Sequence, residues 1–388
     1  MGSDELFGDA ELTELVASSS RVQEAVRSAA AGLIEREVLV ELIVLAAVAE
    51  EHVLVIGEPG TAKSEAVRRV ARALGGRYFE YLLGRFTEPS ELFGPVDLLK
   101  LQLGKLETVT SGMLPEADIA FLDEVFIGST AILNTLLGIL NERIFRRGSV
   151  NVAAPLRICV GASNKLPDDP ALAAFADRFL VRTFVNPVGD SELEALLQAG
   201  LSRPSGGRPA SLQDLDRLTK ARAQVDLTPA QPALAQAVRL LRKSGIALTD
   251  RRIVRAQNLV AAAAVLSGRL RASTRDLWPL INAIPTAIEQ ETGREVLRDL
   301  LAESESVLAA AALDASASAT ARARRLALSA EPLLQAPAPN EPPQSRTLRI
   351  EGLLREIDAS FPKDALPEPL PAVRERLRGL LAPAVPAP

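Results

Sequence analysis

The chain has 388 residues, of which 47% are hydrophobic and 24% are charged, and its formal net charge is −5. This length is enough for two or three compact units that each bury a core. A weakly acidic chain of ordinary composition has no general attraction for nucleic acid or for an anionic membrane, so neither class of partner is indicated.

The sequence holds one cysteine, Cys159, and one histidine, His52. A single cysteine excludes an internal disulfide, and its place in the apolar run "LRICVGAS" predicts a buried, inert thiol. With one residue of each type, a zinc or transition-metal centre cannot be built from the usual ligands. Any metal is therefore expected to be a hard ion held by oxygen.

Residues 21–50 show helical spacing of apolar residues with a break near "GLIE". The longest apolar stretch, 38–49, is interrupted by Glu41 and is too short to span a bilayer of roughly 30 Å. The acidic beginning of the chain has neither a basic nor an apolar export segment. We therefore expect a cytoplasmic chain.

An alternation of apolar runs and helical patterns follows, which predicts a parallel sheet. One helix is expected between the first two strands, at 64–74, and another at 130–143, where Ile132, Leu133 and Leu136 share one face. The five predicted strands are "HVLVIG" (52–57), "RYFEYLL" (77–83), "IAFLDE" (119–124), "LRICVGAS" (156–163) and "FLVRTFV" (179–185).

Two stretches, 97–112 and 143–157, alternate around turn residues and predict inserted β-hairpins. From about residue 191 the pattern is helical, with a surface loop at 202–209. After residue 291 come an Ala-rich helical stretch, a proline-rich linker at 335–345, a helix at 348–358 and one further helix. The expected domains are 1–190 (α/β), 191–290 (helical lid) and 291–388 (helical extension).

The run "GEPGTAKS" lies between the first strand and the following helix, where a helix N-terminus binds anions. It nearly matches the phosphate-binding pattern G-x-x-x-x-G-K-[ST], in which the lysine reaches the β- and γ-phosphates and the serine ligates magnesium. Ala62 replaces the last glycine, which is sterically tolerable if its φ is negative. The other interpretation is an ordinary strand–turn–helix junction. The candidate residues are Gly57, Glu58, Pro59, Gly60, Thr61, Ala62, Lys63 and Ser64.

Polar residues end two later strands. Asp123 is placed to hold the shell of a magnesium ion, and Glu124 to polarise an attacking water. Asn164 ends the "VGASN" strand and can orient that water. Each alone has an ordinary structural explanation, but together with a phosphate loop about 60 residues earlier they indicate a nucleoside triphosphatase.

The combination of motifs resembles the AAA+ ATPases of the MoxR family, most closely the RavA-like branch. The stretches that carry the resemblance are "GEPGTAKS", "FEYLLGRFTEPSELFGPV", "TSGMLPEADIAFLDEVF", "ILNTLLGILNERIFR", "GASNKLPDD" and "FADRFLVR". It covers about residues 20–290. Alanine at the last P-loop glycine is ordinary in that branch. The resemblance implies an α/β P-loop AAA+ core with a five-stranded parallel sheet, a helix-2 insert, a pre-sensor-1 β-hairpin and an all-α lid.

The resemblance also implies roles for single residues. Lys63 and Ser64 correspond to Walker A, Asp123 and Glu124 to Walker B, and Asn164 to sensor 1. Arg178 resembles the arginine finger, which acts on the site of a neighbouring subunit. In "LTDRRIVRA" a helix is expected to begin with Thr249 or Asp250 as its cap. The sensor-2 arginine is Arg251, with Arg252 as the alternative, and Leu33 and Ile34 match the segment that cups the adenine.

The implied activity is ATP hydrolysis with Mg²⁺ in a homo-oligomer, expected to be a hexameric ring, that remodels a client protein together with a von Willebrand A domain partner. Two other readings stay open: an ATP-gated scaffold with little turnover, and a motor subunit for metal insertion related to the chelatases. The residues do not distinguish ATP from GTP. Arg146 and Arg147, at the tip of the second hairpin, either contact an acidic partner or a nucleic acid or are simply solvated.

Overall fold

The computed structural model describes residues 9–104, 106–147, 150–189, 192–201, 210–301, 326–327, 330, 333–334, 343–360, 366 and 370–381. The predicted loop 202–209 lies outside the described residues. So do residues 302–325 of the Ala-rich stretch and residues 335–342 of the proline-rich linker.

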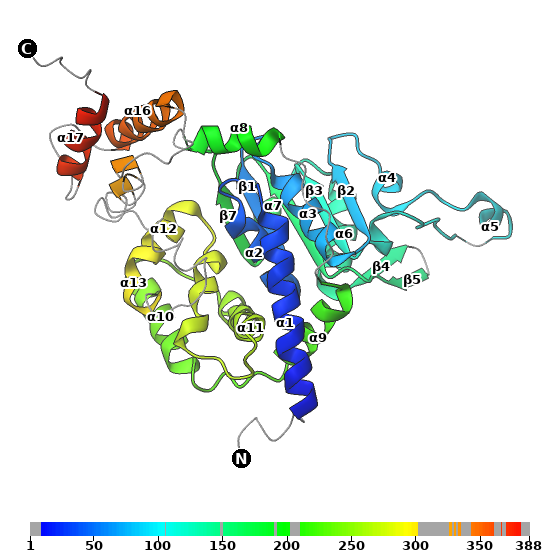
Figure 1. Cartoon of the computed structure of the whole chain (residues 1–388). Helices are drawn as coiled ribbons and strands as arrows, with labels where there is room; N and C mark the ends of the chain where they lie inside the picture. Colours follow the sequence, from blue (N-terminus) through cyan, green and yellow to red (C-terminus); the bar gives the residue numbers. More distant parts are fainter. Residues whose placement is uncertain are drawn as a thin grey trace, which may run out of the picture.

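All five predicted strands are present, and they form one parallel sheet in the order β2-β3-β6-β1-β7. Near-continuous apolar runs suit such strands because helices cover both faces of a parallel sheet. Figure 1 shows the sheet between its helices. The strands are β1 (Val53–Gly57), β2 (Tyr78–Leu82), β3 (Ile119–Asp123), β6 (Ile158–Ser163) and β7 (Val181–Val185).

Alternate residues of each strand point to opposite faces of the sheet. Val53 and Val55 of β1 belong to one hydrophobic cluster, whereas Leu54 and Ile56 belong to another. The first cluster is covered by α1 (Asp9–Ala30), α2 (Glu37–Val48) and α3 (Lys63–Leu74), and the second by α4 (Pro89–Phe93), α6 (Thr130–Glu142) and α7 (Pro170–Ala176). The predicted helices 64–74 and 130–143 are thereby confirmed.

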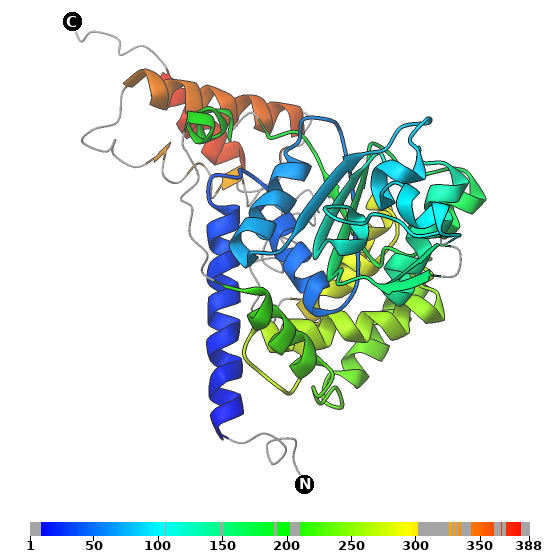
Figure 2. The same cartoon turned by 90° about the vertical axis from the view of Figure 1, so that its right-hand side faces the viewer.

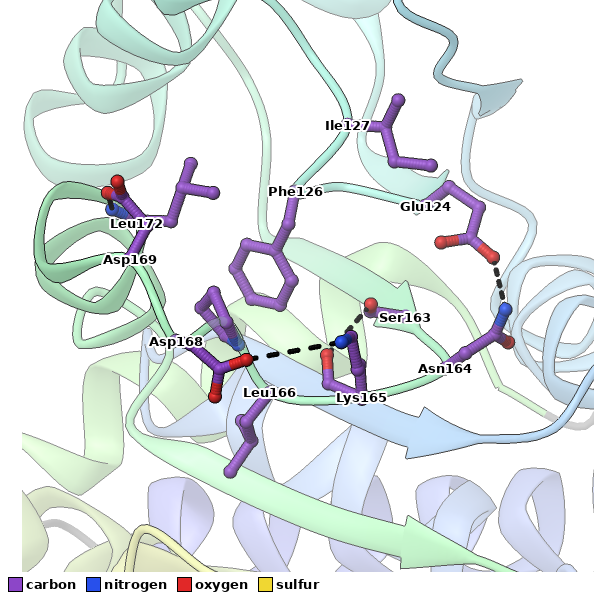
Figure 3. A pocket seen from close by; sticks show the side chains of 11 residues that line it. Glu124, Phe126, Ile127, Ser163, Asn164, Lys165, Leu166, Asp168, Asp169 and Leu172 are labelled. Carbon is purple, nitrogen blue, oxygen red and sulfur yellow. Dashed lines mark hydrogen bonds and ion pairs between the residues drawn. The ribbon is translucent and has the colours of Figure 1, made fainter.

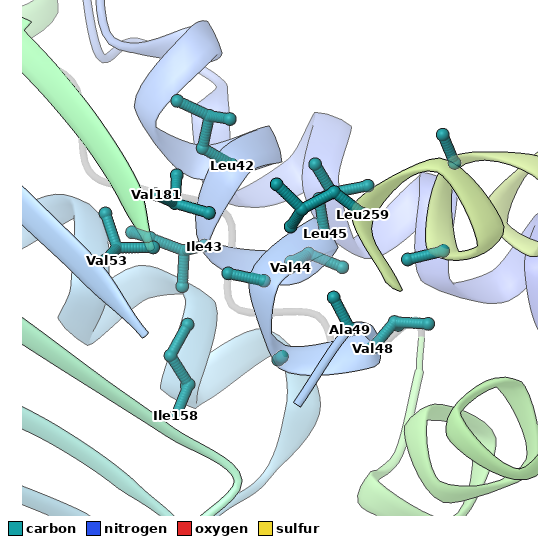
Figure 4. Packing of buried hydrophobic residues seen from close by; sticks show 14 of the residues in the cluster. Leu42, Ile43, Val44, Leu45, Val48, Ala49, Val53, Ile158, Val181 and Leu259 are labelled. Atoms are coloured by element: carbon teal, nitrogen blue, oxygen red, sulfur yellow. The ribbon is translucent and has the colours of Figure 1, made fainter. Parts of the chain in front are cut away.

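The apolar run 38–49 lies in α2, most of which is buried. Figure 4 shows its side chains between the sheet and a lid helix, α11 (Asp250–Leu266). One cluster of buried residues therefore continues from the sheet through α2 into the lid. No helix in the described part of the chain has the length and apolar character needed to cross a membrane.

The two predicted hairpins have different structures. Residues 144–153 form the expected antiparallel pair of β4 (Ile144–Arg147) and β5 (Val150–Ala153). The other insert is not a β-hairpin: it carries the short helix α5 (Leu98–Gln102) and a single bridge between Val96 and Thr108. Asp97 begins α5 by accepting hydrogen bonds from the amides of Leu99 and Lys100. This arm extends away from the sheet in Figure 1.

The region after β7 is helical, as predicted. Thr249 is the N-cap of α11, since its side chain accepts a hydrogen bond from the amide of Arg252. The view in Figure 2 shows α1 running along the sheet and the lid. The elements after β7 are α8 (Leu193–Leu201), α9 (Leu212–Arg222), α10 (Gln231–Lys243), α11, α12 (Ala287–Val296), α13 (Arg298–Leu301) and the 3₁₀ turns η4 (Thr274–Asp276) and η5 (Trp278–Ala283). A further 3₁₀ turn, η2 (Leu114–Glu116), precedes β3.

The last described helices are α16 (Pro343–Ser360) and α17 (Leu370–Leu381). They share a small hydrophobic cluster of their own, which includes Leu353, Ile357 and Leu377. This cluster is separate from the two clusters that cover the sheet. The predicted terminal helices are therefore present, while the domain boundaries at 190 and 290 stay predictions.

Candidate nucleotide site

The loop of residues 57–62 joins the end of β1 to the start of α3. Gly57 lies against β7, where an added Cβ would be 2.2 Å from the carbonyl oxygen of Val185. Gly60 has a φ of +81°, which favours glycine. These two glycines are thus needed for different reasons, a close approach and a left-handed conformation.

Ala62 has a φ of 60° and a ψ of 24°, the left-handed region. Alanine was expected to cost little here if its φ were negative, and that condition is not met. A left-handed residue with a Cβ costs roughly 1–2 kcal/mol. Non-glycine residues held in this region are concentrated at functional sites, where the surrounding structure fixes them.

Lys63 is the first residue of α3 and is only 7% exposed. Its Nζ donates hydrogen bonds of 2.7 Å to the carbonyl oxygens of Gly57 and Glu58. Burial lowers the pKa of Lys63, while the carboxylates of Asp123 and Glu124 act in the opposite direction. The lysine therefore lies within electrostatic reach of both predicted acids.

The predicted acids and Asn164 meet because β3 and β6 are neighbours, with Leu122 opposite Gly161. Asn164 Nδ2 donates a hydrogen bond of 2.8 Å to Glu124 Oε1, as Figure 3 shows. Glu124 has a φ of 51°, so it is a second strained position at this edge of the sheet. The structure thus brings Lys63, Asp123, Glu124 and Asn164 together.

The oxygen ligands at this edge fit a magnesium ion. Ser64 lies in the first turn of α3, and Asp123 is the last residue of β3. Burial lowers the pKa of Lys63, which directly precedes Ser64, and the charge of Asp123 opposes this shift. Hydroxyl and carboxylate oxygens are the ligands that Mg²⁺ takes when it is shared with phosphates. The first turn of α3 also has amide groups without intrahelical acceptors, which suits an anion.

A pocket of about 440 Å³ opens beside the Glu124–Asn164 pair. Its apolar wall includes Phe126 and Leu172, and Phe126 packs edge-on against Phe175 of α7. Figure 3 shows Phe126 and Leu172 beside the opening. The full lining is Glu124, Phe126, Ile127, Ser163, Asn164, Lys165, Leu166, Pro167, Asp168, Asp169 and Leu172.

Arg178 is not near this group. It lies three residues before Val181, which pairs with Val53 at the start of β1. Gly57 and the P-loop are instead at the carboxyl end of β1. The length of β1 alone separates the two edges by about 13 Å. The Nε atom of Arg178 is buried and has no hydrogen-bond partner within the described residues. Its backbone carbonyl accepts a hydrogen bond of 3.1 Å from Arg255, which also pairs with the buried Glu51.

The two sensor-2 candidates have opposite environments. Arg252 is 1% exposed, and its guanidinium donates to Asp177 and to the carbonyls of Phe179, Leu180 and Ala283. It therefore ties the lid to the segment before β7. Arg251 is exposed, and its pKa is lowered first by partial burial and then by the nearby charge of Arg178. Arg251 thus shares the edge of Arg178, and neither lies at the P-loop of its own chain.

Leu33 and Ile34 precede α2, with Leu33 buried and Ile34 half-buried. Two residues later comes Arg36, which sequence reasoning missed. Its Nε donates to the carbonyl of Thr61 in the P-loop, at 2.8 Å. The only signal in the sequence is an arginine directly before an almost wholly apolar helix. Its partners are backbone carbonyls, which no side-chain pattern reveals.

Comparisons with known proteins show the family and the fold of this chain. Residues 20–219 match the family model described as the MoxR domain in the MoxR-vWA-beta-propeller ternary systems. Two uncharacterized proteins of Methanocaldococcus jannaschii are 36% identical over 248 residues and 34% identical over 267 residues. These alignments cover 63% and 69% of this chain, and 66% and 70% of those proteins. The chain thus spans about two thirds of the length of these relatives.

The chaperone MoxR1 of Mycobacterium tuberculosis is 26% identical over 196 residues, which is 49% of this chain and 51% of that protein. A crystal structure from Cytophaga hutchinsonii, named as a candidate ATPase, superposes with a TM-score of 0.60 at 14% sequence identity. The superposition covers 75% of this chain and 96% of that one. At this identity the structural likeness shows the fold alone.

Proposed function

This chain is a member of the MoxR family of AAA+ ATPases, and from that premise we propose that it hydrolyses ATP at sites shared between neighbouring copies. The observation that carries the proposal is the hydrogen bond between Asn164 and Glu124 beside a P-loop lysine. A carboxylate fixed in this place is what activation of an attacking water requires. The assignments of single residues below are part of the proposal.

Each residue of the loop edge has a distinct task. The amides at the start of α3 and Lys63 hold the β- and γ-phosphates. Asn164 fixes the Glu124 carboxylate, which accepts a proton from the attacking water. Ser64 and Asp123 would hold Mg²⁺, whose charge neutralises the phosphate oxygens. Leu33 and Ile34 contact the adenine in this proposal.

The position of Arg178 supports action across an interface. An arginine at the edge of the sheet where strands begin cannot reach the P-loop of its own chain, which follows the strand ends. A neighbouring copy packed against this edge would receive Arg178, with Arg251 beside it. An arginine supplied in this way stabilises charge on the transferred phosphoryl and accelerates hydrolysis by about 10³–10⁵ in other NTPases.

We extend the proposal to assembly and partners. A hexameric ring would supply an arginine to every site, and the description of the matching family model names von Willebrand A and β-propeller components. We therefore propose a von Willebrand A partner and a client protein that ATP turnover remodels. Placement in the RavA-like branch stays a prediction.

The first test compares phosphate release by the wild type and by Glu124→Gln. We expect the substitution to lower steady-state hydrolysis of Mg·ATP by at least about a hundredfold, because the amide cannot accept the proton. Binding of ATP should persist. Glu295→Gln, an exposed position on α12, is the matched control and should retain full turnover. Equal, negligible release by all three proteins would support the scaffold reading instead.

A further inference from the structure

Arg36 lies between the P-loop and the end of β7. Arg36 is only 4% exposed. Its guanidinium donates three hydrogen bonds, all to backbone carbonyls. Nε donates to Thr61 at 2.8 Å, Nη1 to Glu35 at 2.7 Å and Nη2 to Asn186 at 2.7 Å. Asn186 directly follows β7, whose last residue pairs with Gly57.

The hydrogen bond to Thr61 has a consequence for the next amide. In a planar trans peptide the carbonyl and the N–H point in opposite directions. The carbonyl of Thr61 and the N–H of Ala62 belong to one peptide unit. Because the carbonyl of Thr61 points toward the buried guanidinium of Arg36, the N–H of Ala62 points away from Arg36.

The same contact bears on the strained residue. Ala62 has a φ of 60°, and its own carbonyl accepts the hydrogen bond from Ala66 that begins α3. A change to a negative φ would disturb the hydrogen bond from Ala66 to its carbonyl or the hydrogen bond from Arg36 to the preceding peptide. A glycine would adopt this conformation without such support.

We propose that Arg36 is a positioning residue that holds the P-loop in its phosphate-binding shape and compensates for alanine at position 62. It acts through the peptide between Thr61 and Ala62 and does not itself contact the nucleotide. The inference rests on the proposed nucleotide site, and it adds the device by which a left-handed alanine is maintained there.

The test is a double-mutant cycle on the full chain. Binding of a fluorescent ATP analogue with Mg²⁺ is measured for the wild type, Arg36→Met, Ala62→Gly and the double variant. Because a charged hydrogen bond to the loop is lost, we expect Arg36→Met to weaken binding about tenfold to a hundredfold. In the A62G background, the fold-loss of affinity caused by Arg36→Met should be smaller than in the wild type by a factor of at least about three.

Arg182→Met serves as the matched control, because Arg182 is also a buried arginine that donates to a backbone carbonyl, that of Pro285. It lies outside the P-loop, so its effect on binding should be the same with and without A62G. If Arg36→Met does not fold, as judged by thermal unfolding, Arg36→Lys replaces it. A lysine cannot reach Thr61 and Asn186 together, and we expect at least about a threefold loss.

Two results would overturn the inference: unchanged affinity in Arg36→Met or Arg36→Lys, or a loss of equal size in the Ala62 and A62G backgrounds. These results differ from failure of the proposed function itself, in which the wild-type chain would bind no ATP analogue. The binding measurement requires no turnover and no arginine from a neighbouring copy.

Discussion

At the scale of single residues, the site is marked by backbone strain. Ala62 and Glu124 both have positive φ values, and they end the P-loop and follow β3 at the same edge of the sheet. Hydrogen bonds lie on the backbone at both positions: the carbonyl of Thr61, before Ala62, accepts from Arg36, and Glu124 donates its amide to Asp123 Oδ1 and accepts from the amide of Ile127. Strain that is over-determined in this way keeps a site in one geometry before the substrate arrives.

Asn164 gives a prediction at this scale. Replacing it by alanine removes the hydrogen bond to Glu124 Oε1, so the carboxylate can turn away from the attacking water. We expect Asn164→Ala to lower steady-state phosphate release at least about tenfold while ATP binding, followed by calorimetry, changes little. Asn134→Ala, at an exposed position of α6, is the control. A loss of binding as large as the loss of turnover would contradict this role.

The sequence points to the residues to which the proposal gives chemical roles, but not to Arg36, whose hydrogen bonds go to the backbone. Lys63, Glu124 and Asn164 follow strands of one parallel sheet, whose carboxyl ends lie together, so the structure places these side chains close to one another, while their roles stay predictions. The conformation of Ala62 could not be predicted, because the identity of the residue as alanine does not fix the sign of its φ. Arg36 was missed for a different reason: its partners are backbone carbonyls, which no side-chain pattern reveals.

At the scale of elements, two neighbouring arginines on α11 have different surroundings. Arg252 has four acceptors, three buried carbonyls and the partly exposed carboxylate of Asp177, whereas Arg251 is exposed. We expect Arg252→Met to lower the free energy of unfolding by at least about 2 kcal/mol, since buried carbonyls and Asp177 lose their donor. Arg251→Met should change stability by less than about 0.5 kcal/mol and lower ATP turnover.

Chemical denaturation and phosphate release on the same two preparations measure this contrast. The opposite result, in which Arg251→Met unfolds readily and Arg252→Met is stable but inactive, would reverse the assignment. Such a reversal would make Arg252 the arginine that senses nucleotide.

Asp214 joins α9 to α1 and gives a prediction that depends on pH. Burial by itself raises the pKa of Asp214, but hydrogen bonds from Arg21 and Ser211 lower it to about 2, below its ordinary 3.8. The stabilisation of about 2 kcal/mol is present above pH 3.8 and is lost as the pH falls toward 2. Asp214→Asn should lower stability by this amount at neutral pH and flatten its dependence between pH 4 and 2.

Thermal and denaturant unfolding at several pH values measure this effect. Glu24→Gln is the control, because Glu24 forms an exposed ion pair with Arg27 on the same α1 helix and should contribute less than about 0.5 kcal/mol. If both variants have the same small effect, Asp214 does not hold α9 against α1.

The insert at 97–112 shows where pattern reasoning fails for an element. Its leucines alternate as in a strand, but alternation predicts a strand only when one face is buried. Leu99 and Leu103 are 75% and 79% exposed, so here the pattern carries no information about burial. The local cap by Asp97 decides for a short helix instead. In β1 the same type of argument succeeds because Val53 and Val55 are fully buried.

At the scale of the whole molecule, the proposed shared site predicts complementation. Lys63→Ala and Arg178→Ala should each abolish ATP turnover when pure. In a one-to-one mixture, a site is complete when an Arg178→Ala copy supplies the loop and a Lys63→Ala copy supplies the arginine. Random head-to-tail mixing gives about a quarter of such sites, so turnover should return to about a quarter of the wild-type value.

The control mixes Lys63→Ala with the double variant, which offers no complete combination and should stay inactive. Phosphate release that equals the sum of the two pure variants in both mixtures would show that each copy uses only its own residues. In that case Arg178 would have a structural role, with its carbonyl bound by Arg255.

The two ends of the strands carry complementary halves of the proposed site, the P-loop at the carboxyl ends and Arg178 at the amino ends. A two-fold symmetric dimer brings like surfaces together and would leave both halves unmatched. An open head-to-tail assembly leaves one unmatched half of the site at each of its ends, whereas a closed ring matches every P-loop with an arginine. The ATPase activity per subunit should therefore rise with protein concentration while open assemblies grow longer. It should become constant once the assemblies have closed into rings.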